Sequence, residues 1–443
     1  MNSTKKVIDQ ANVFLWGDPV GTVIWDKSRD LGIFQYNKSF VSKGLQVSPL
    51  LMPLNADMKY AFPALDRTTY YGLPPLLADA LPDKFGNALI DIWLRDQGRE
   101  LNSFSPVERL CYMGKRAMGA LEFRPATARV LDQSIEISID EMSALAQKIL
   151  TKKAQLSVNR NKDSAMAIRS IIEIGTSAGG NRAKAVIVWN KKTGEIRSGQ
   201  VDAPAGFEHW IIKFDNVSEK ILGDPHGYGR VEYAYYNMAI AAGINMNPCR
   251  LWEENGRAHF MTQRFDRGES GQRLHMQSLC ALAGYDFNQI GKYHYEEVFG
   301  IIQKLRLGHQ VVQEQYRRMV FNVMARCQDD HAKNISFLMT PDGKWDLSPA
   351  YDNAWSYSPK GLWTSQHQMR VNGKRDGFTI QDLIETGKSY EISKAKTICE
   401  QVGDAIAHWS TFSKKSGVSK AMIQQIAKTH RKELFAKRNQ SSR

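Results

Sequence analysis

The first part of the chain alternates short apolar runs with turn residues. Residues 13–25, VFLWGDPVGTVIW, carry β-forming side chains on both sides of Gly and Pro, which predicts two strands around a G-D-P-V-G turn. Ser138 and Glu141 have the spacing of a capping box, which predicts a helix that runs to about Leu150. The polar and basic stretch 151–163 follows. We place a domain boundary near it.

The middle of the chain combines strand and helix patterns. The apolar runs 183–189 and 209–214 predict strands. Residues 231–242 have helical spacing and stop at Gly243, which suits the left-handed turn after a helix. Two further apolar runs flank the Asn-Gly pair at 255–256, and this pattern predicts a β-hairpin.

After about Gln277 the pattern becomes almost entirely helical. Apolar residues recur at helical spacing between 312 and 327, which predicts a helix with one buried face that ends at QDDHAKN. Residues 335–339 and 345–350, joined by TPDGK, predict a second hairpin. The chain therefore reads as an α+β protein in which a β-rich lobe precedes a helical lobe.

Composition narrows the classes of protein that fit. The 443 residues are 42% hydrophobic and 24% charged, as in an ordinary globular protein. No run approaches the roughly 18 apolar residues of a membrane span, and MNSTKKVIDQ lacks the apolar core of a secretory signal. We expect a cytoplasmic protein that does not bind membranes. Its five cysteines form no C-x-x-C pair, which favours reduced core thiols over disulfides or a zinc site.

Positive charge is concentrated at the end of the chain. The formal net charge is +13, and residues 414–443 contain nine basic side chains against the single acid Glu433. This pattern predicts a solvated basic tail helix, with contact to nucleic acid or an acidic partner as the alternative.

The most informative residues bracket the second predicted hairpin. Asp329 and Asn334 have the D-x-x-x-x-N interval of a protein-kinase catalytic loop, and Asp352 follows the hairpin. Phosphoryl transfer needs one carboxylate to orient the attacking hydroxyl, and a second carboxylate with an amide oxygen to hold magnesium. DDHAKN alone is typical of a solvated loop, but the combination favours phosphoryl transfer.

Two upstream features fit the same chemistry. The loop 175–184, GTSAGGNRAK, lies between apolar runs, and its glycines would let backbone N–H groups approach phosphate oxygens. An ordinary hairpin turn is the alternative. Lys213, on an otherwise apolar strand, is a candidate cation for the α and β phosphates, although a lysine at a strand end can also simply extend to solvent.

Taken in order, these motifs resemble those of the HipA family of bacterial Ser/Thr kinase toxins. The resemblance covers nearly the whole chain and rests on FLWGDPVGTVIW, SPLLMPL, LLADALPDKFGN, GTSAGGNRAK, HWIIKF, VEYAYYNMAIAAGI, MTQRFDR, DDHAKNISFL and LSPAYDNA. It implies a two-lobed, protein-kinase-like fold with an additional N-terminal domain. The expected domains are 1–155 (HipA-type N-terminal domain), 156–270 (nucleotide-binding lobe) and 271–443 (helical lobe).

The resemblance also implies a role for individual residues. Asp329 would be the catalytic base, Asn334 and Asp352 would bind Mg²⁺, and Ser177 would be autophosphorylated, which would expel the loop and silence the enzyme. The ATP contacts would be Gly179, Gly180, Asn181, Arg182, Ala183 and Lys184 over the triphosphate, Lys213 at the phosphates, Gln263, Arg264 and Phe265 at adenine, Asp266 near the ribose, and His331 and Lys333 close to the nucleotide.

Two positions depart from the family pattern. Asp330 stands where the best-known member has a small Gly after its catalytic Asp, so two adjacent acids compete for the role of base. Spacing favours Asp329. Ala183 stands where many members have Pro, which would leave the loop more mobile.

The resemblance implies an ATP- and Mg²⁺-dependent protein kinase that acts as a toxin. Its expected partners are a protein substrate, for which relatives suggest an aminoacyl-tRNA synthetase, and a helix-turn-helix antitoxin of HipB type, with DNA contacted only through the antitoxin complex. A small-molecule kinase and an inactive scaffold in a repressor complex are the alternatives.

Two other classes of enzyme fit the sequence less well. One is a serine hydrolase, through the G-x-S-x-G at 175–179, and the other is a metal-dependent hydrolase, through Asp329, Asp330, His331 and Asp352.

Overall fold

The chain forms two compact units. Unit 1 comprises residues 1–226, 252–286 and 337–344, and unit 2 comprises 227–251, 287–336 and 345–443. This computed structural model describes residues 8–82, 86–87, 90–91, 99, 104–127, 136, 138–151, 183–199, 203–215, 227–268 and 271–435. The loop residues Ser177, Gly179, Gly180, Asn181 and Arg182 lie outside the described residues. The three-domain division stays a prediction.

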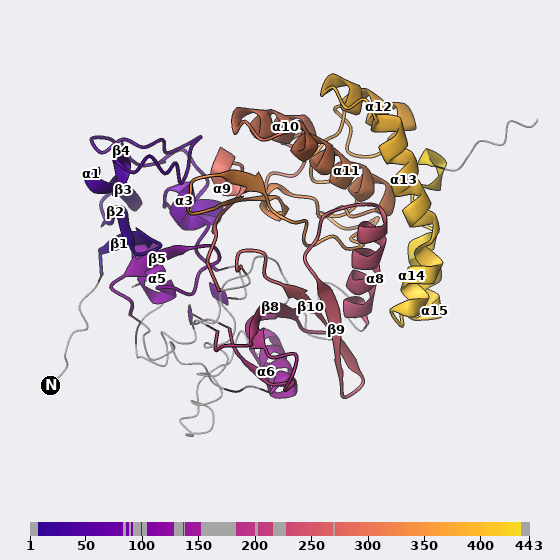
Figure 1. Ribbon diagram of the computed structural model, residues 1–443, viewed down its shortest axis with the longest axis horizontal. Coiled ribbons are helices and arrows are strands. Elements are labelled where there is room, and N and C mark those ends of the chain that lie inside the picture. Colours follow the sequence, from indigo (N-terminus) through magenta and orange to yellow (C-terminus); the bar gives the residue numbers. More distant parts are fainter. Residues whose placement is uncertain are drawn as a thin grey trace, which may run out of the picture. The chain divides into compact units, whose positions relative to one another are not determined.

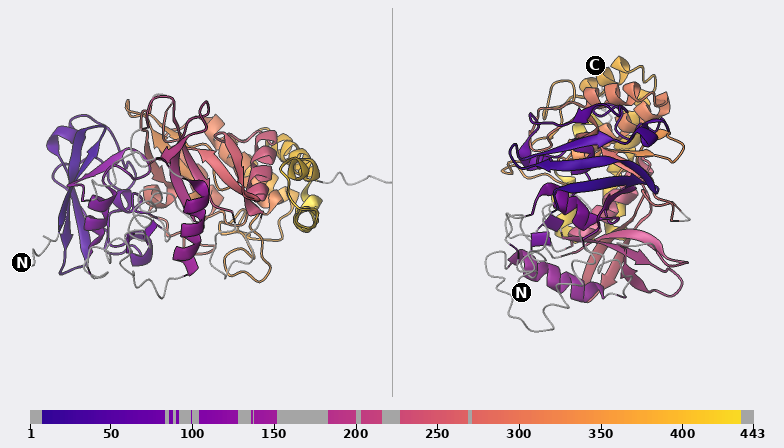
Figure 2. Two further views of the ribbon diagram at one scale, coloured as in Figure 1. Left: turned by 90° about the horizontal axis from the view of Figure 1, so that it is seen from below. Right: turned by 90° about the vertical axis from the view of Figure 1, so that its left-hand side faces the viewer.

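Unit 1 begins with a five-stranded sheet, drawn in indigo and purple in Figure 2. Its order is β4-β3-β2-β1-β5, and its strands are β1 (Gln10–Leu15), β2 (Asp18–Asp26), β3 (Leu31–Tyr36), β4 (Lys59–Tyr60) and β5 (Leu121–Arg124). The first turn is tighter than predicted. Trp16 and Gly17 have φ values of 49° and 87°, as in a two-residue hairpin turn, so Asp18 and Pro19 already belong to β2.

A second five-stranded sheet has the order β7-β6-β8-β10-β9. Its strands are β6 (Lys184–Trp189), β7 (Ile196–Ser198), β8 (Glu208–Lys213), β9 (Cys249–Glu254) and β10 (Arg257–Gln263), and unit 1 holds only the second half of β9. The Asn255-Gly256 hairpin is confirmed, since both residues have positive φ values of 48° and 74°.

Short helices complete unit 1. They are α1 (Lys38–Val41), α2 (Arg67–Tyr70), α3 (Pro75–Ala78), α5 (Pro106–Met113), α6 (Ile139–Thr151) and α9 (Leu279–Ala283). The predicted cap of α6 is confirmed, because the Glu141 N–H donates to Ser138 Oγ at 3.4 Å. Strands β11 (His275–Ser278) and β12 (Ser336–Met339) also belong here, apart from the first residue of β12.

Unit 2 is mainly helical. Its helices are α8 (Tyr228–Ala241), α10 (Tyr295–Lys304), α11 (His309–Ala325), α12 (Ile380–Ser389), α13 (Ala395–Ala407), α14 (Trp409–Lys415) and α15 (Lys420–Ala427), with 3₁₀ turns η4 (Ala332–Asn334) and η5 (Lys432–Leu434). Helix α13 packs against α8, α11, α12 and α14 (Figure 1). The predicted apolar stripe of α11, including Tyr316, Met319 and Val323, is fully buried.

The second predicted hairpin is confirmed by its turn and its base. Strand β13 (Trp345–Leu347) returns after β12, the Thr340 N–H donates to the Lys344 carbonyl at 3.0 Å, and the Ser348 N–H donates to the Ser336 carbonyl at 2.9 Å. The predicted helical continuation is wrong for residues 351–379, which form no helix. Pro, Gly and side-chain hydrogen bonds hold this segment as an irregular loop.

The end of the chain is less solvated than its charge suggested. Arg431 is only 2% exposed, so the prediction of a solvated basic tail is wrong at this position. All five cysteines are buried thiols outside any disulfide, as predicted. Of the helices in the described part of the chain, none has the length and apolar character that crossing a bilayer requires.

Candidate active site

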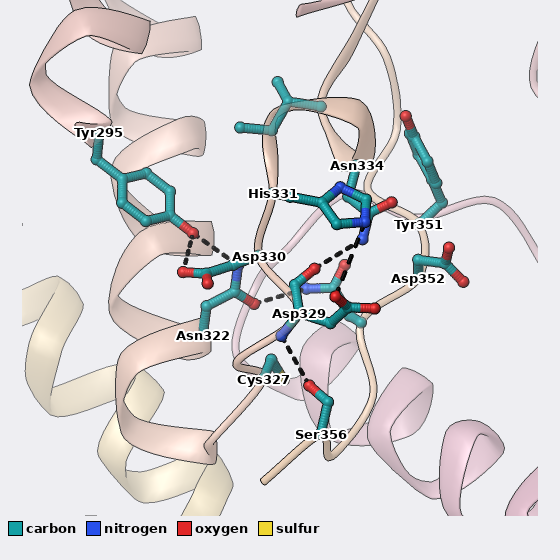
Figure 3. Close-up of a pocket in the computed structure, with 12 residues that line it drawn as sticks. Tyr295, Asn322, Cys327, Asp329, Asp330, His331, Asn334, Tyr351, Asp352 and Ser356 are labelled. Atoms are coloured by element: carbon teal, nitrogen blue, oxygen red, sulfur yellow. Dashed lines mark hydrogen bonds and ion pairs between the residues drawn. The ribbon is translucent and has the colours of Figure 1, made fainter. Parts of the chain in front are cut away.

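Unit 2 contains a hollow where α11 ends and the hairpin returns (Figure 3). It encloses about 320 Å³ of free space, part of it open to solvent. Four of the predicted site residues line it: Asp329, His331, Asn334 and Asp352. The other lining residues are Tyr295, Asn322, Cys327, Asp330, Ile335, Tyr351, Asn353 and Ser356.

Asp329 presents its carboxylate to this hollow from a backbone that is held on both sides. Helix α11 stops because Arg326 takes a left-handed conformation, with φ 59°. The Asp329 N–H donates to Ser356 Oγ at 2.9 Å, and its carbonyl accepts from Asn334 Nδ2 at 2.9 Å. Its side chain remains 53% exposed, and one oxygen accepts from Gln368 Nε2 at 3.1 Å. The carboxylate is therefore both fixed and accessible.

Asp330 has the opposite environment. Its carboxylate is buried and accepts from Tyr295 Oη at 3.0 Å, His367 Nδ1 at 2.8 Å and the Gln368 N–H at 2.8 Å. Burial alone would raise the pKa of Asp330, but the His367 ring and these hydrogen bonds keep that pKa below its ordinary value. A saturated, buried carboxylate is a poor proton acceptor, so the geometry favours Asp329 as the base.

Asn334 and Asp352 offer oxygen atoms of the kind that Mg²⁺ prefers. Because the Asn334 amide nitrogen donates to the Asp329 carbonyl, its oxygen is the atom left to act as a ligand. Asp352 takes a left-handed conformation, with φ 58°, directly after the hairpin. The described residues contain no cluster of three or more His, Cys, Asp or Glu placed for a metal. One carboxylate and one amide nevertheless fit Mg²⁺, which completes its shell with water and phosphate oxygens.

His331 and Lys333 share an aromatic neighbour. The Phe287 ring lies 5.5 Å from the His331 ring and 5.3 Å from Lys333 Nζ. The Lys333 carbonyl accepts from Tyr351 Oη at 2.7 Å, which ties the DDHAKN loop to the segment that follows β13. His331 also lines the hollow.

The predicted phosphate-binding residues lie in unit 1. Lys184 and Lys213 are directly opposite each other on β6 and β8, so their side chains share one face of the sheet. Lys213 Nζ also lies 5.6 Å from the centre of the Phe260 ring. Ala183 precedes β6, and its carbonyl accepts from the Phe214 N–H at 3.0 Å.

The residues expected to contact adenine and ribose also make contacts within unit 1. Asp266 is fully buried, and its carboxylate accepts from Arg264 at 2.7 Å, Arg267 at 2.8 Å and the Gly119 N–H at 2.7 Å. Burial would raise the pKa of Asp266, but the two arginines hold it well below its ordinary value. This carboxylate anchors the two arginines and the Gly119 amide, and its contact with the ribose stays a prediction.

Residues 263–265, which were expected to contact adenine, also make contacts within the second sheet. The Arg264 N–H donates to the His209 carbonyl at 2.9 Å, so this amide is already committed within the sheet. Gln263 pairs with Trp210 across β10 and β8. Of the predicted segment, Phe265 is half-buried and follows the last paired residue.

Comparison with known proteins agrees with this architecture. Residues 11–124 match the HipA N-terminal domain, and residues 176–433 match the HipA-like C-terminal domain. The chain belongs to the HipA family. A solved HipA, from the Shewanella oneidensis MR-1 toxin–antitoxin complex of HipA, HipB and operator DNA, has 16% sequence identity and a TM-score of 0.66. That comparison covers 94% of this chain and 95% of the Shewanella chain, and shows that the HipA-like α+β fold is shared.

A second solved structure, the Helicobacter pylori proinflammatory kinase CtkA, has 11% identity and a TM-score of 0.31, over 50% of this chain and 90% of CtkA. A search of curated proteins found no match.

Several residues of this HipA-family site were missed by the sequence interpretation. Ser356 and Gln368 contact Asp329 from 27 and 39 residues away along the chain, and no local motif marks them. Asn322 lies within the apolar stripe of α11, where its polarity was the available signal, and it accepts from Asn353 Nδ2 at 3.2 Å. Burial raises the pKa of the Cys327 thiol well above its ordinary value, which makes it a poor nucleophile.

Proposed function

We propose that this protein is an ATP- and Mg²⁺-dependent Ser/Thr protein kinase that acts as the toxin of a toxin–antitoxin pair. The observation that supports this most strongly is the shared hollow of Asp329, Asn334 and Asp352, in which the first acid is accessible and its neighbour Asp330 is not. Membership of the HipA family supports the same reaction class.

In the proposed reaction, Asp329 orients the acceptor hydroxyl and receives its proton as the phosphoryl group transfers. Asn334 and Asp352 would hold Mg²⁺, which supplies charge neutralisation at the phosphate oxygens when it is bound. Lys184 and Lys213 would offset further phosphate charge from the face of the β6–β8 pair. The alternative hydrolases lose support, because Asp330 is saturated by donors and a strand, not a helix, begins at Lys184.

The direct test is phosphate transfer from γ-labelled ATP, with Mg²⁺, to the purified chain and to proteins of a cell lysate. Asp329→Asn should lower the transfer rate by about 10²- to 10⁴-fold while ATP still binds. Asp352→Asn should instead weaken Mg²⁺-dependent ATP binding in calorimetry. Asp342→Asn is the matched control, because this acid lies in an exposed turn with its side chain 55% exposed. Normal transfer by Asp329→Asn would refute the assignment.

Autophosphorylation at Ser177 is part of the proposal. The serine precedes the glycines expected to cover the ATP phosphates, and a phosphate dianion there would repel ATP and favour release of the loop. Mass spectrometry after incubation with ATP should find one phosphate on Ser177. An active preparation without it would remove this part of the proposal.

The partners follow from the family. The Shewanella HipA was crystallised with HipB and operator DNA. We propose a HipB-type antitoxin for this chain too, with DNA contacted through that complex, and a protein substrate in the cytoplasm such as an aminoacyl-tRNA synthetase. Label found only in small molecules of the lysate would favour the alternative of a small-molecule kinase. Absence of any transfer would favour an inactive scaffold.

A further inference from the structure

We propose that Gln368 is a positioning residue for Asp329, and that Asp330 holds Gln368 in place. The inference rests on the proposed role of Asp329 as the catalytic carboxylate. It assigns a purpose to the second acid of the QDDHAKN motif, and to a glutamine in the irregular segment that follows the hairpin.

Gln368 binds both adjacent acids, each through a different group. Its side-chain Nε2 donates to Asp329 Oδ1 at 3.1 Å, and its backbone N–H donates to Asp330 Oδ1 at 2.8 Å. The first bond fixes which Asp329 oxygen faces the protein, and so directs Oδ2 toward an acceptor hydroxyl. The second bond fixes the backbone from which the glutamine reaches.

The Asp330 anchor is itself rigid. Its Oδ2 accepts from Tyr295 Oη and from His367 Nδ1, and the Asp330 and His367 side chains are 1% and 0% exposed. His367 Nε2 lies 2.9 Å from Arg431 Nη1. Because arginine can only donate, Nε2 must accept and the ring proton must be on Nδ1. The His367 donor to Asp330 is therefore fixed in direction.

A buried glutamine at position 368 lowers the stability of the fold, which a purely structural role does not explain. The residue is 4% exposed, and its Oε1 has no hydrogen-bond partner among the described residues. A buried, unsatisfied amide oxygen destabilises a fold, and an apolar side chain of similar size would avoid that cost. The one polar contact that the Gln368 side chain makes within the described structure is with the carboxylate proposed to be catalytic.

The test compares Gln368→Leu and Gln368→Glu with wild type, using γ-labelled ATP and lysate protein as acceptor. Gln368→Glu keeps the length of the side chain and Gln368→Leu removes its polar end, and both variants lose the N–H donor. We expect the maximal transfer rate to fall about 10- to 100-fold, with the half-saturating ATP concentration within about twofold of wild type. The melting temperature of Gln368→Leu should be unchanged or higher, because the unsatisfied oxygen is gone.

Gln381→Leu is the matched control. Its Nε2 also donates to a carboxylate, Glu385 Oε1 at 3.0 Å, but on the exposed face of α12. This variant should keep wild-type transfer. If Gln368→Leu transfers phosphate at the wild-type rate, or loses rate only in proportion to lost folded protein, the positioning role is refuted.

Asp330→Asn tests the second half of the proposal. One orientation of the amide puts its NH₂ against the Gln368 N–H, and the other puts it against Tyr295 and the neighbouring His367. Either way a bond that fixes the 367–368 backbone is lost, and the transfer rate should fall. In the Gln368→Leu background the same change should have less effect on rate than in wild type, and additive effects would refute the coupling. Asp329→Asn is measured in parallel. If it remains active, the proposed catalytic assignment fails; if it is inactive while Gln368→Leu is normal, only the positioning role fails.

Discussion

Arg431 should be among the most stabilising side chains of unit 2, and Arg431→Met tests this. The arginine is 2% exposed and donates to the Val323 carbonyl, to His367 Nε2 at 2.9 Å and to Asp376 Oδ1 at 2.6 Å. Its guanidinium carbon also lies 5.0 Å from the centre of the Phe378 ring. Methionine keeps the stem and the aromatic contact, so the change isolates the loss of charge and hydrogen bonds.

The magnitude follows from the acceptors that lose this donor. The Val323 carbonyl and His367 Nε2 would each lose a buried donor, at about 1–3 kcal/mol per group. Asp376 loses less, because its side chain is 34% exposed and retains Arg326 at 3.3 Å. The sum agrees with the roughly 3–5 kcal/mol typical of a broken buried ion pair. At about 2–4 °C per kcal/mol, the melting temperature should fall by roughly 6 to 20 °C.

Thermal unfolding followed by circular dichroism and calorimetry measures this change. Lys396→Met is the control in the same unit, because Lys396 pairs with Glu400 at 4.0 Å on an exposed surface, with side chains 78% and 61% exposed. It should cost less than about 0.5 kcal/mol. An Arg431→Met protein that melts within about 2 °C of wild type would refute the argument that the buried contacts of this arginine stabilise the fold.

Two further predictions concern unit 1. Asp266→Asn should destabilise the protein by about 3 kcal/mol or more in urea unfolding, because two buried arginines lose their counter-charge; a stable variant with weakened ATP binding would instead support the original ribose role. Burial lowers the pKa of His275 to about 4 from its ordinary 6.5, so protonation of the unfolded chain should reduce stability as the pH falls from about 6.5 to 4. His275→Gln, which keeps a donor for the Val47 carbonyl, should flatten this part of the pH–stability curve, and an unchanged slope in this variant would refute the role of His275.

The fold was predictable where local pattern determines local structure. The Asn255-Gly256 turn, the cap at Ser138 and the stripe of α11 each depend on residues a few positions apart, and each is confirmed. The predictions failed where contacts between residues far apart in the sequence determine the local structure. Residues 351–379 are held by bonds to groups such as Asp330 and Arg326, and a helical pattern read over a short window contains no information about such bonds.

The candidate site likewise combines residues that a local motif identifies with residues that only the tertiary structure brings together. The D-x-x-x-x-N interval identified Asp329 and Asn334 because the two residues are only five positions apart and are joined by a hydrogen bond from Asn334 Nδ2 to the Asp329 carbonyl. Ser356 and Gln368 reach the same carboxylate loop from a segment with no regular structure, so their role follows only from the three-dimensional arrangement.

Asp329 and Asp330 show why sequence could not separate two adjacent acids by chemistry alone. Both follow the same helix end, and both are aspartates, so their intrinsic proton affinities are alike. What differs is the number of donors that the rest of unit 2 directs at each carboxylate: three bind Asp330, from Tyr295, His367 and Gln368, whereas only Gln368 donates at hydrogen-bond distance to the carboxylate of Asp329 within the described structure. A carboxylate that is saturated and buried supports the loop, and one that keeps an accessible oxygen can accept a proton. The division of roles between neighbouring residues is therefore a property of the tertiary fold, and exchanging their surroundings should exchange their functions.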